Sequence, residues 1–448
     1  MRLLNSITLQ MEEFISDSIP EYAILSHTWG EEEVSFRDIQ GVDAAKMKGF
    51  TKLQNCCALV ARDSFNYVWI DTCCIDKSSS AELSEAINSM YKWYKNAKTC
   101  YAHLEDVVVP ADVSDLEVLE LLRPSRWFTR GWTLQELIAP STVKFYDKTW
   151  NNIGSKKSLQ KVLCDITGID IRVLGGDEPW ACNVAQRMSW ASDRTTTRVE
   201  DIAYCLMGLF HVNMPLLYGE GGSKAFSRLQ EEIIKGTEDH SLFTWFAKDA
   251  QPRLTCRGLL ASSPQEFGNS KSHTLAAWQY SELLVHSSIN FGTGRNPWGD
   301  PHSLTSRGLR MSLPLKRKDG EHPQGIEYLA CLNCQTENHK FLCVYLQRLP
   351  TRDQIYGRVR AHEVVLVPSE EVNTFEDSTI YIVQSISNGK EVYKLEDTIR
   401  MAPTNWSTRV NRISLQIFFV LRIDRIFVHG MSRSFVPLEV SLSMMIHG

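Results

Sequence analysis

Short runs of β-branched and aromatic residues alternate with stretches of helical periodicity over the first 150 residues. The runs that we expect to form strands lie at 22–26, 67–70, 99–104 and 143–146. Between them, hydrophobic residues recur every three or four positions, which is typical of helices that bury one face. This alternation indicates βαβ units around a parallel sheet, so we predict an α/β domain over residues 1–150.

Two of the predicted helices show a buried stripe in full. The stripes consist of Phe50, Leu53, Cys57 and Val60 in the first helix and of Leu83, Ile87, Met90 and Tyr94 in the second. Ser79 precedes the second stripe and Glu82 follows three residues later, which predicts a capping box in which each side chain bonds a free backbone amide. A third helix is expected over 130–139, because Pro140 ends it.

The pattern changes twice after residue 150. Residues 151–245 are mostly helical in periodicity, and we predict a helical extension of the α/β domain there. From 250 to 448 the pattern becomes one of alternating strands separated by clusters of Gly, Pro, Asn and Asp, which predicts a β-rich C-terminal domain, either a sandwich or a barrel. The expected strands lie at 308–313, 328–332, 341–346, 363–367 and 379–383.

Composition narrows the class of protein. The chain of 448 residues is 43% hydrophobic and 23% charged, as globular proteins are, and its net charge of -5 offers no general attraction to nucleic acid. The N-terminus lacks the apolar run of a signal peptide, and no stretch has the ~20 apolar residues of a membrane helix. With 12 cysteines and no secretion signal, we expect reduced thiols and a cytoplasmic location.

Polar and aromatic side chains gather where the predicted strands end, which is where open α/β sheets bind ligands. Ser26, His27 and Trp29 follow the first strand, and Asp71 follows the second. The later segment SRWFTRGWTLQELIAP at 125–140 adds charged groups among large aromatics, a composition that suits stacking of a ring and anchoring of hydroxyls or phosphate. Its candidate side chains are Arg126, Trp127, Arg130, Trp132 and Glu136. The alternative is that Trp127 and Trp132 are core residues and that Arg130 lies on the surface.

Two other chemistries are weighed against this one. Cys331, Cys334, His339 and Cys343 have nearly the spacing of a zinc knuckle, but they lie in two strand patterns that read as a β-hairpin without metal. We therefore predict no metal site. Cys73 or Cys74 with His27 as base is a conceivable thiol nucleophile, and the same two cysteines suit simple core packing.

Four segments together carry a resemblance to a known family. They are SHTWG at 26–30, YVWIDTCCIDKSSSAELSEAINSMYKWY at 67–94, the segment 125–140, and RMSWASDRTTTRVEDIAYCLMGLFHVNMPLLYGEG at 187–221. The first 240 residues resemble the fungal heterokaryon-incompatibility (HET) domain family. The resemblance implies a role in non-self recognition, in which fusion of incompatible cells triggers programmed cell death.

HET domains are in turn similar to TIR domains, which implies a TIR/flavodoxin-like parallel sheet and, by extension, cleavage of NAD. SRWFTRGWTLQEL resembles a TIR motif whose glutamate is catalytic, although the spacing is longer here, and the likeness places that role on Glu136. A carboxylate can stabilise the oxocarbenium-like sugar formed when nicotinamide leaves. On this reading NAD is a substrate and no cofactor is required.

The supporting roles and partners remain alternatives at this point. Trp29 or Trp132 would stack on a ring of NAD, and Arg126 or Arg130 would neutralise its pyrophosphate. A competing hypothesis is a scaffold without enzymatic activity that self-associates through the HET domain and recruits partners. Both hypotheses expect self-association and an activating protein partner.

Overall fold

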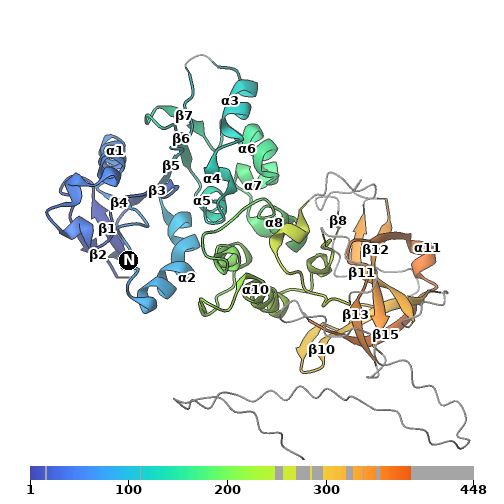
Figure 1. Cartoon of the computed structure of the whole chain (residues 1–448). Helices are drawn as coiled ribbons and strands as arrows, with labels where there is room; N and C mark the ends of the chain where they lie inside the picture. Colours follow the sequence, from blue (N-terminus) through green and yellow to red (C-terminus); the bar gives the residue numbers. More distant parts are fainter. Residues whose placement is uncertain are drawn as a thin grey trace, which may run out of the picture. The chain divides into compact units, whose positions relative to one another are not determined.

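The computed structural model describes residues 1–15, 18–110, 113–247, 256–268, 283–284, 296–318, 326–336, 338–349 and 354–384. All of them belong to one unit that spans residues 1–395 (Figure 1). Among these residues, no helix is long and apolar enough to cross a membrane. The division of the chain at 150 and 250 remains a prediction.

A seven-stranded mixed sheet organises the N-terminal region. Its order is β2 (Met11–Glu13), β1 (Arg2–Asn5), β4 (Tyr67–Trp69), β3 (Tyr22–His27), β5 (Thr99–His103), β6 (Val143–Tyr146) and β7 (Asn152–Ser155). The four central strands, β4-β3-β5-β6, are parallel. Their spatial order of second, first, third and fourth parallel strand is that of flavodoxin-like sheets, so the predicted fold class is confirmed.

The edges of the sheet differ from the prediction. Strands β1, β2 and β7 are antiparallel to their neighbours, so the sheet is mixed. These strands have only three or four residues each and lack a continuous apolar run. Because an edge strand is buried on fewer sides, its sequence need not be uniformly hydrophobic, and its pairing depends on the sheet beside it.

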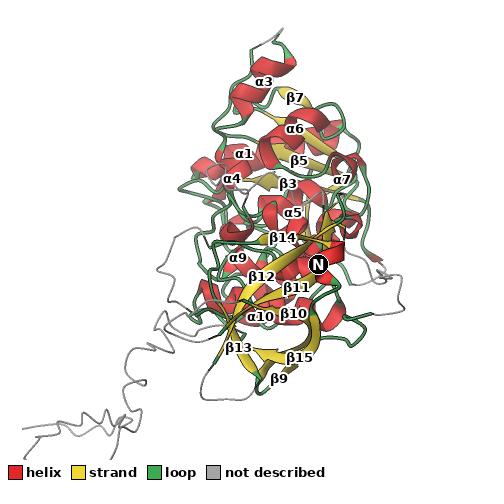
Figure 2. Ribbon diagram, turned by 90° about the vertical axis from the view of Figure 1, so that its right-hand side faces the viewer, coloured by secondary structure: helices red, strands yellow, loops and turns green. Residues whose placement is uncertain are grey.

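Two long helices follow the first two parallel strands, and in Figure 2 the strands of this sheet run among helices. They are α1 (Lys48–Arg62) and α2 (Ser80–Asn96), and both bury the predicted apolar face. The capping box before α2 is only half formed. Ser79 Oγ accepts a hydrogen bond from the Glu82 amide at 3.3 Å, but the Glu82 carboxylate accepts from the Asp76 amide at 2.8 Å instead.

The third helix, predicted over 130–139, is shorter and forms α5 (Thr133–Ile138). A short helix α4 (Arg126–Thr129), capped by Ser125, precedes it and lies outside the predicted range. Before them lies α3 (Asp115–Leu122), which the sequence interpretation did not include. All six residues of α5 are buried, because this helix packs against the sheet and also meets α2.

The next part of the chain forms the predicted helical extension. Its helices are α6 (Gln160–Thr167), α7 (Ile171–Gly175), α8 (Val184–Ser189), α9 (Asp201–Tyr204) and α10 (Gly222–Gly236), with 3-10 turns η4 (Pro179–Ala181), η5 (Met207–Phe210) and η6 (His240–Phe243). Gly208 in η5 lies against α2, and a Cβ there would be 2.1 Å from Tyr91 Cβ. Only glycine permits this close approach, so the extension and α2 form one packed body.

The C-terminal region contains a closed five-stranded β-barrel, which is one of the two predicted alternatives. Strands β11 (Glu327–Thr336), β12 (Lys340–Arg348), β13 (Ile355–Arg358), β15 (Glu376–Ile382) and β10 (Gly308–Arg317) pair in a ring. β8 (Leu283–Leu284), β9 (Ser303–Thr305) and β14 (Val365–Pro368) pair outside the ring, and α11 (Ser369–Val372) follows β14. Closure removes the free edges that a flat sheet would expose.

Candidate functional site

The carboxylate of Glu136 lies at the end of the central parallel strand. The Ser26 hydroxyl, near the end of β3, donates to Glu136 Oε2 at 2.5 Å. The Trp127 indole N–H, from α4, donates to the same Ser26 oxygen at 2.8 Å. Glu136 is only 7% exposed, and Ser26 and Trp127 are fully buried. Three elements far apart in the sequence therefore converge on one buried carboxyl group.

Burial has a direct electrostatic consequence for this carboxyl group. The pKa of Glu136 is raised to about 7, chiefly by loss of water and also by the nearby Asp71 carboxylate, although the Ser26 hydrogen bond and the Arg130 guanidinium oppose the shift. A carboxyl group with a pKa near neutrality populates both protonation states at cellular pH. Such a group, buried beside specific charges at the end of a sheet, is a candidate for acid–base or electrostatic catalysis.

Next to Ser26, the imidazole of His27 is buried between two carboxylates. Its Nε2 lies 3.8 Å from Glu33 Oε2, and its Nδ1 lies 3.9 Å from Asp71 Oδ1. Neither ring nitrogen has a hydrogen-bond partner among the described residues. Burial, together with the positive charge of Lys52, holds the pKa of His27 well below its usual value. The ring is therefore neutral and keeps one acceptor nitrogen at neutral pH.

Trp29 is the exposed member of the cluster. It is 43% exposed, and its indole N–H donates to Asp71 Oδ2 at 2.9 Å. The Lys77 ammonium lies 3.6 Å from the centroid of its ring, and the Arg130 guanidinium carbon lies at 5.7 Å. Cations favour the faces of indole rings, so Trp29 and the two cations form an aromatic and positively charged rim beside the carboxylates.

Two predicted site residues are placed elsewhere. Arg126 pairs with Glu105 Oε1 at 2.7 Å on the surface, and the Trp132 indole N–H donates to Asp201 Oδ2 in α9 at 3.3 Å. In the part of the chain that the structure describes, no hydrogen bond or ion pair joins either of them to Glu136 or Asp71. The structure thus brings together Ser26, His27, Trp29, Asp71, Arg130 and Glu136.

Sequence reasoning missed Lys77 as a member of this cluster, and it named Trp127 without choosing between a pocket residue and a core residue. Lys77 lies in the polar stretch that follows β4, so its position after a strand end is a signal that the sequence offers. Trp127 gives no such signal, because a buried tryptophan in a short helix looks like core until its N–H is seen to meet Ser26.

The thiol and zinc alternatives find no support. Cys73 is buried with its thiol 3.8 Å from the Ile70 carbonyl, and its pKa is raised well above the usual value, first by its interaction with Cys74 and then by burial. A thiol of this kind is a packing group and a poor nucleophile. Cys331 and Cys343 are cross-strand neighbours in the β11–β12 hairpin, which confirms the hairpin interpretation. Within the described ranges, no group of three or more potential ligands is arranged to hold a metal ion.

Comparison with known proteins identifies the domain that contributes Ser26, His27, Trp29 and Asp71 to this cluster. A family model described as heterokaryon incompatibility protein (HET) matches residues 22–118, which run from β3 into α3. The chain is 47% identical over 224 residues, about 49% of its length, to vegetative incompatibility protein HET-E-1 of Podospora anserina. This chain is a HET domain protein. The identity confirms the resemblance carried by the four sequence segments.

The match covers only part of this chain and of its relative. The chain spans only 16% of the length of the curated relative that it matches. A second family model, a domain of unknown function, matches residues 224–327, from α10 to the start of β11. No solved structure matches the chain at a significant level. The HET domain is therefore identified by sequence, and its architecture is the one described above.

Proposed function

We propose that this protein is an effector of heterokaryon incompatibility, in which an activated HET domain triggers cell death by cleaving NAD. The assignment to incompatibility is supported by the 47% identity to a vegetative incompatibility protein. The proposal of NAD cleavage is supported chiefly by one observation, the buried Glu136 carboxyl group with a pKa of about 7, bonded to Ser26 at the end of a flavodoxin-like sheet.

The chemistry requires little besides a positioned carboxylate. When the bond between nicotinamide and ribose breaks, positive charge develops on the sugar, and nicotinamide is neutral once it has left. In our proposal the ionised Glu136 stabilises that charge and holds a ribose hydroxyl. Water then adds to the sugar carbon from which nicotinamide has left, which gives ADP-ribose and releases one proton. A low-dielectric surrounding strengthens this interaction, because few waters compete with the carboxylate.

The other members of the cluster have proposed binding roles. Of the two tryptophans considered from sequence, Trp29 is the better candidate for stacking, because it is exposed and Trp132 bonds to α9. Arg130 is the better candidate for the pyrophosphate, because Arg126 is paired with Glu105 on the surface. We propose that Lys77, which lies on the Trp29 ring, shares this role with Arg130. NAD is the substrate in this scheme, and no resident cofactor is needed.

The proposal includes a cellular setting. We propose a cytoplasmic protein that is activated by another protein and acts when copies of its HET domain associate, without nucleic acid as a partner. Proximity of copies would move side chains around Trp29, so that substrate reaches the nearly buried Glu136. Such gating is common for sites that exclude water during the reaction.

The direct test measures nicotinamide release from NAD by the purified full-length chain, clustered through an inducible dimerisation tag. We expect release by the parent, none by Glu136→Gln, and parental release by Glu120→Gln. Glu120 is a matched control, because it is an exposed carboxylate of α3 outside the cluster. The same three proteins are then expressed in cells, and cell death is scored beside the cellular NAD content.

The scaffold hypothesis makes the opposite prediction for the same proteins. If the clustered parent kills cells without nicotinamide release, and Glu136→Gln kills equally well, NAD cleavage is wrong and self-association with partner recruitment replaces it. If Glu136→Gln is the only one of the three proteins that loses both nicotinamide release and cell killing, and its thermal unfolding shows that it is folded, the enzymatic proposal stands.

A further inference from the structure

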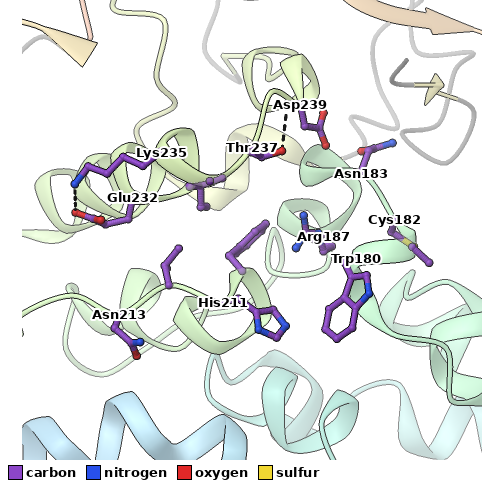
Figure 3. A pocket seen from close by; sticks show the side chains of 15 residues that line it. Trp180, Cys182, Asn183, Arg187, His211, Asn213, Glu232, Lys235, Thr237 and Asp239 are labelled. Carbon is purple, nitrogen blue, oxygen red and sulfur yellow. Dashed lines mark hydrogen bonds and ion pairs between the residues drawn. The ribbon is translucent and has the colours of Figure 1, made fainter. Parts of the chain in front are cut away.

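A second concave site lies in the helical extension, apart from the Glu136 cluster. It has a volume of about 1140 Å³ and is walled by η4, α8, η5 and the C-terminal half of α10 (Figure 3). Ligand pockets commonly have volumes of roughly 300–1,000 Å³, so this one has room for a molecule of nucleotide size. Neither the proposed reaction nor the family assignments give it a role.

Arg187 of α8 forms no ion pair among the described residues, and Asp239 acts on its guanidinium only through longer-range electrostatic attraction. One of its terminal nitrogens donates to the Leu209 carbonyl at 3.0 Å, and its guanidinium lies 4.6 Å from the centre of the Phe210 ring. Its Nε is buried without a hydrogen-bond partner among the described residues. A guanidinium that is largely removed from water and not paired with a carboxylate is stabilised when an anion binds beside it.

The acidic groups near Arg187 are already engaged. Asp239 accepts hydrogen bonds from the Val184 amide at 2.7 Å and the Ser241 amide at 2.8 Å, so it caps two helices. Glu232 pairs with Lys235 at 2.7 Å across the rim of the pocket, as the dashed line in Figure 3 shows. Each carboxylate therefore has its own partners, and Arg187 remains available to an incoming anion.

The opposite side of the pocket is aromatic. Trp180 is 50% exposed, and the ring of His211 lies 4.7 Å from it at 69°. The backbone of His211 is held in the left-handed region, with φ of 55°, which a non-glycine residue adopts at some cost in free energy. Figure 3 shows both rings on the same side of the pocket, below Arg187. Because the two rings are far from parallel, the exposed face of Trp180 is the surface on which a planar ring can stack, with His211 beside it.

We propose that this pocket binds a small ligand that combines a planar heteroaromatic ring with an anionic group, of the chemical class of the mononucleotides. The ring stacks on Trp180 beside the His211 ring, and the phosphate or carboxylate pairs with Arg187. Both interactions are made by residues of the helical extension, so the site is independent of Glu136 and of NAD cleavage.

The site also has a physical link to the α/β domain. Lys95, near the end of α2, pairs with Glu178 at 2.7 Å and lies 5.3 Å from the Trp180 ring. Tyr91 of the same helix lies 6.4 Å from the His211 ring. Tyr94, one turn on, donates to the Leu25 carbonyl of β3 at 3.2 Å. A ligand in the pocket therefore contacts residues that pack on the helix beside the Glu136 cluster.

The test uses AMP as probe and the full-length chain, with binding measured by isothermal titration calorimetry. Adenosine lacks the anion and inorganic phosphate lacks the ring, so each is expected to bind at least about tenfold more weakly than AMP. Trp180→Ala and Arg187→Gln should each weaken AMP binding by at least about tenfold, and Arg187→Lys should restore part of it. Arg172→Gln, which removes an exposed arginine of α7, is the matched control and should bind AMP as the parent does.

Several outcomes would overturn the proposal. In the first, Trp180→Ala binds AMP as tightly as the parent does. In the second, only Trp29→Ala loses AMP affinity. In the third, the correctly folded parent does not bind AMP. The second outcome would move AMP to the Glu136 cluster. Circular dichroism and thermal unfolding of each variant separate loss of the site from loss of the fold, and Trp180→Ala is the safer variant because half of that side chain is exposed. Nicotinamide release is a separate readout, so failure of the two proposals is distinguishable.

Discussion

The end of the HET sheet and the β-barrel each bury a charged side chain, but they surround it differently. In the barrel, Arg358 is fully buried and donates to the Phe243 carbonyl at 2.9 Å and the Trp245 carbonyl at 2.7 Å, with its guanidinium 3.9 Å from the Trp245 ring. In the sheet, Glu136 is also buried, yet it accepts a hydrogen bond from the hydroxyl of Ser26. The Arg358 guanidinium links two parts of the chain, whereas the Glu136 carboxyl group can gain or lose its proton near neutral pH.

The difference shows how a buried charge can be assigned to structure or to chemistry. Arg358 donates to two backbone carbonyls, so its guanidinium satisfies neutral acceptors and holds two parts of the chain together. Glu136 changes its charge near pH 7, because burial opposes ionisation and Ser26 only partly compensates. Four substitutions test this comparison, from the largest expected effect on unfolding to the smallest.

Removal of the barrel cation should have the largest effect. Arg358→Met keeps much of the side-chain volume but leaves the carbonyls of Phe243 and Trp245 without these donors. We expect a loss of about 3–5 kcal/mol in the free energy of unfolding. Denaturant unfolding followed by circular dichroism measures it. The control is Arg317→Ala, an exposed residue of the same barrel, which should change stability by less than about 0.5 kcal/mol.

Removal of the sheet carboxylate should stabilise the protein, but only at higher pH. The pKa of Glu136 is about 7 in the folded chain and 4.5 ordinarily, so folding favours the protonated acid. Its contribution to stability is complete below pH 4.5 and is lost as the pH rises to 7 and beyond. Glu136→Gln cannot ionise, so at pH 8 it should exceed the parent by about 3 kcal/mol and at pH 4.5 match it. Equal pH dependence of the two proteins would contradict the raised pKa.

The Ser26 hydroxyl should contribute less, and in a defined direction. Ser26→Ala removes the donor to Glu136 and the acceptor of the Trp127 indole N–H. We expect a loss of about 1–3 kcal/mol in stability and a rise in the pKa of Glu136, because the lost hydrogen bond favoured the ionised form. Infrared difference spectra against Glu136→Gln report the carboxyl band, which should persist to higher pH than in the parent.

The surface pair should contribute least. Arg126, with a side chain 61% exposed, pairs with Glu105 at 2.7 Å, and exposed pairs contribute about 1 kcal/mol or less. Arg126→Ala should therefore leave both stability and nicotinamide release close to the parental values. A large loss of release with intact stability would place Arg126 back among the substrate-binding residues.

Much of the fold could be predicted because its signals are local. The strands at 22–26 and 143–146 are buried runs of β-branched and aromatic residues, and the structure has them within a residue of the predicted bounds. Strands β1, β2 and β7 could not be predicted, since each has only three or four residues and no continuous apolar run. The barrel was foreseen as one of two alternatives, because the sequence shows strands but not which strands close the ring.

For the candidate site, the sequence by itself determined which side chains follow the ends of the parallel strands, and so it offered Ser26, His27, Trp29 and Asp71. Only the tertiary structure decided that the carboxyl group of Glu136 lies beside these residues, and that Lys77 and Trp127 belong to the same cluster. It also showed that Arg126 and Trp132 bond to residues outside the cluster. The physical reason is that strand direction follows from local pattern, whereas burial, and with it the pKa of Glu136, depends on contacts between segments about 110 residues apart.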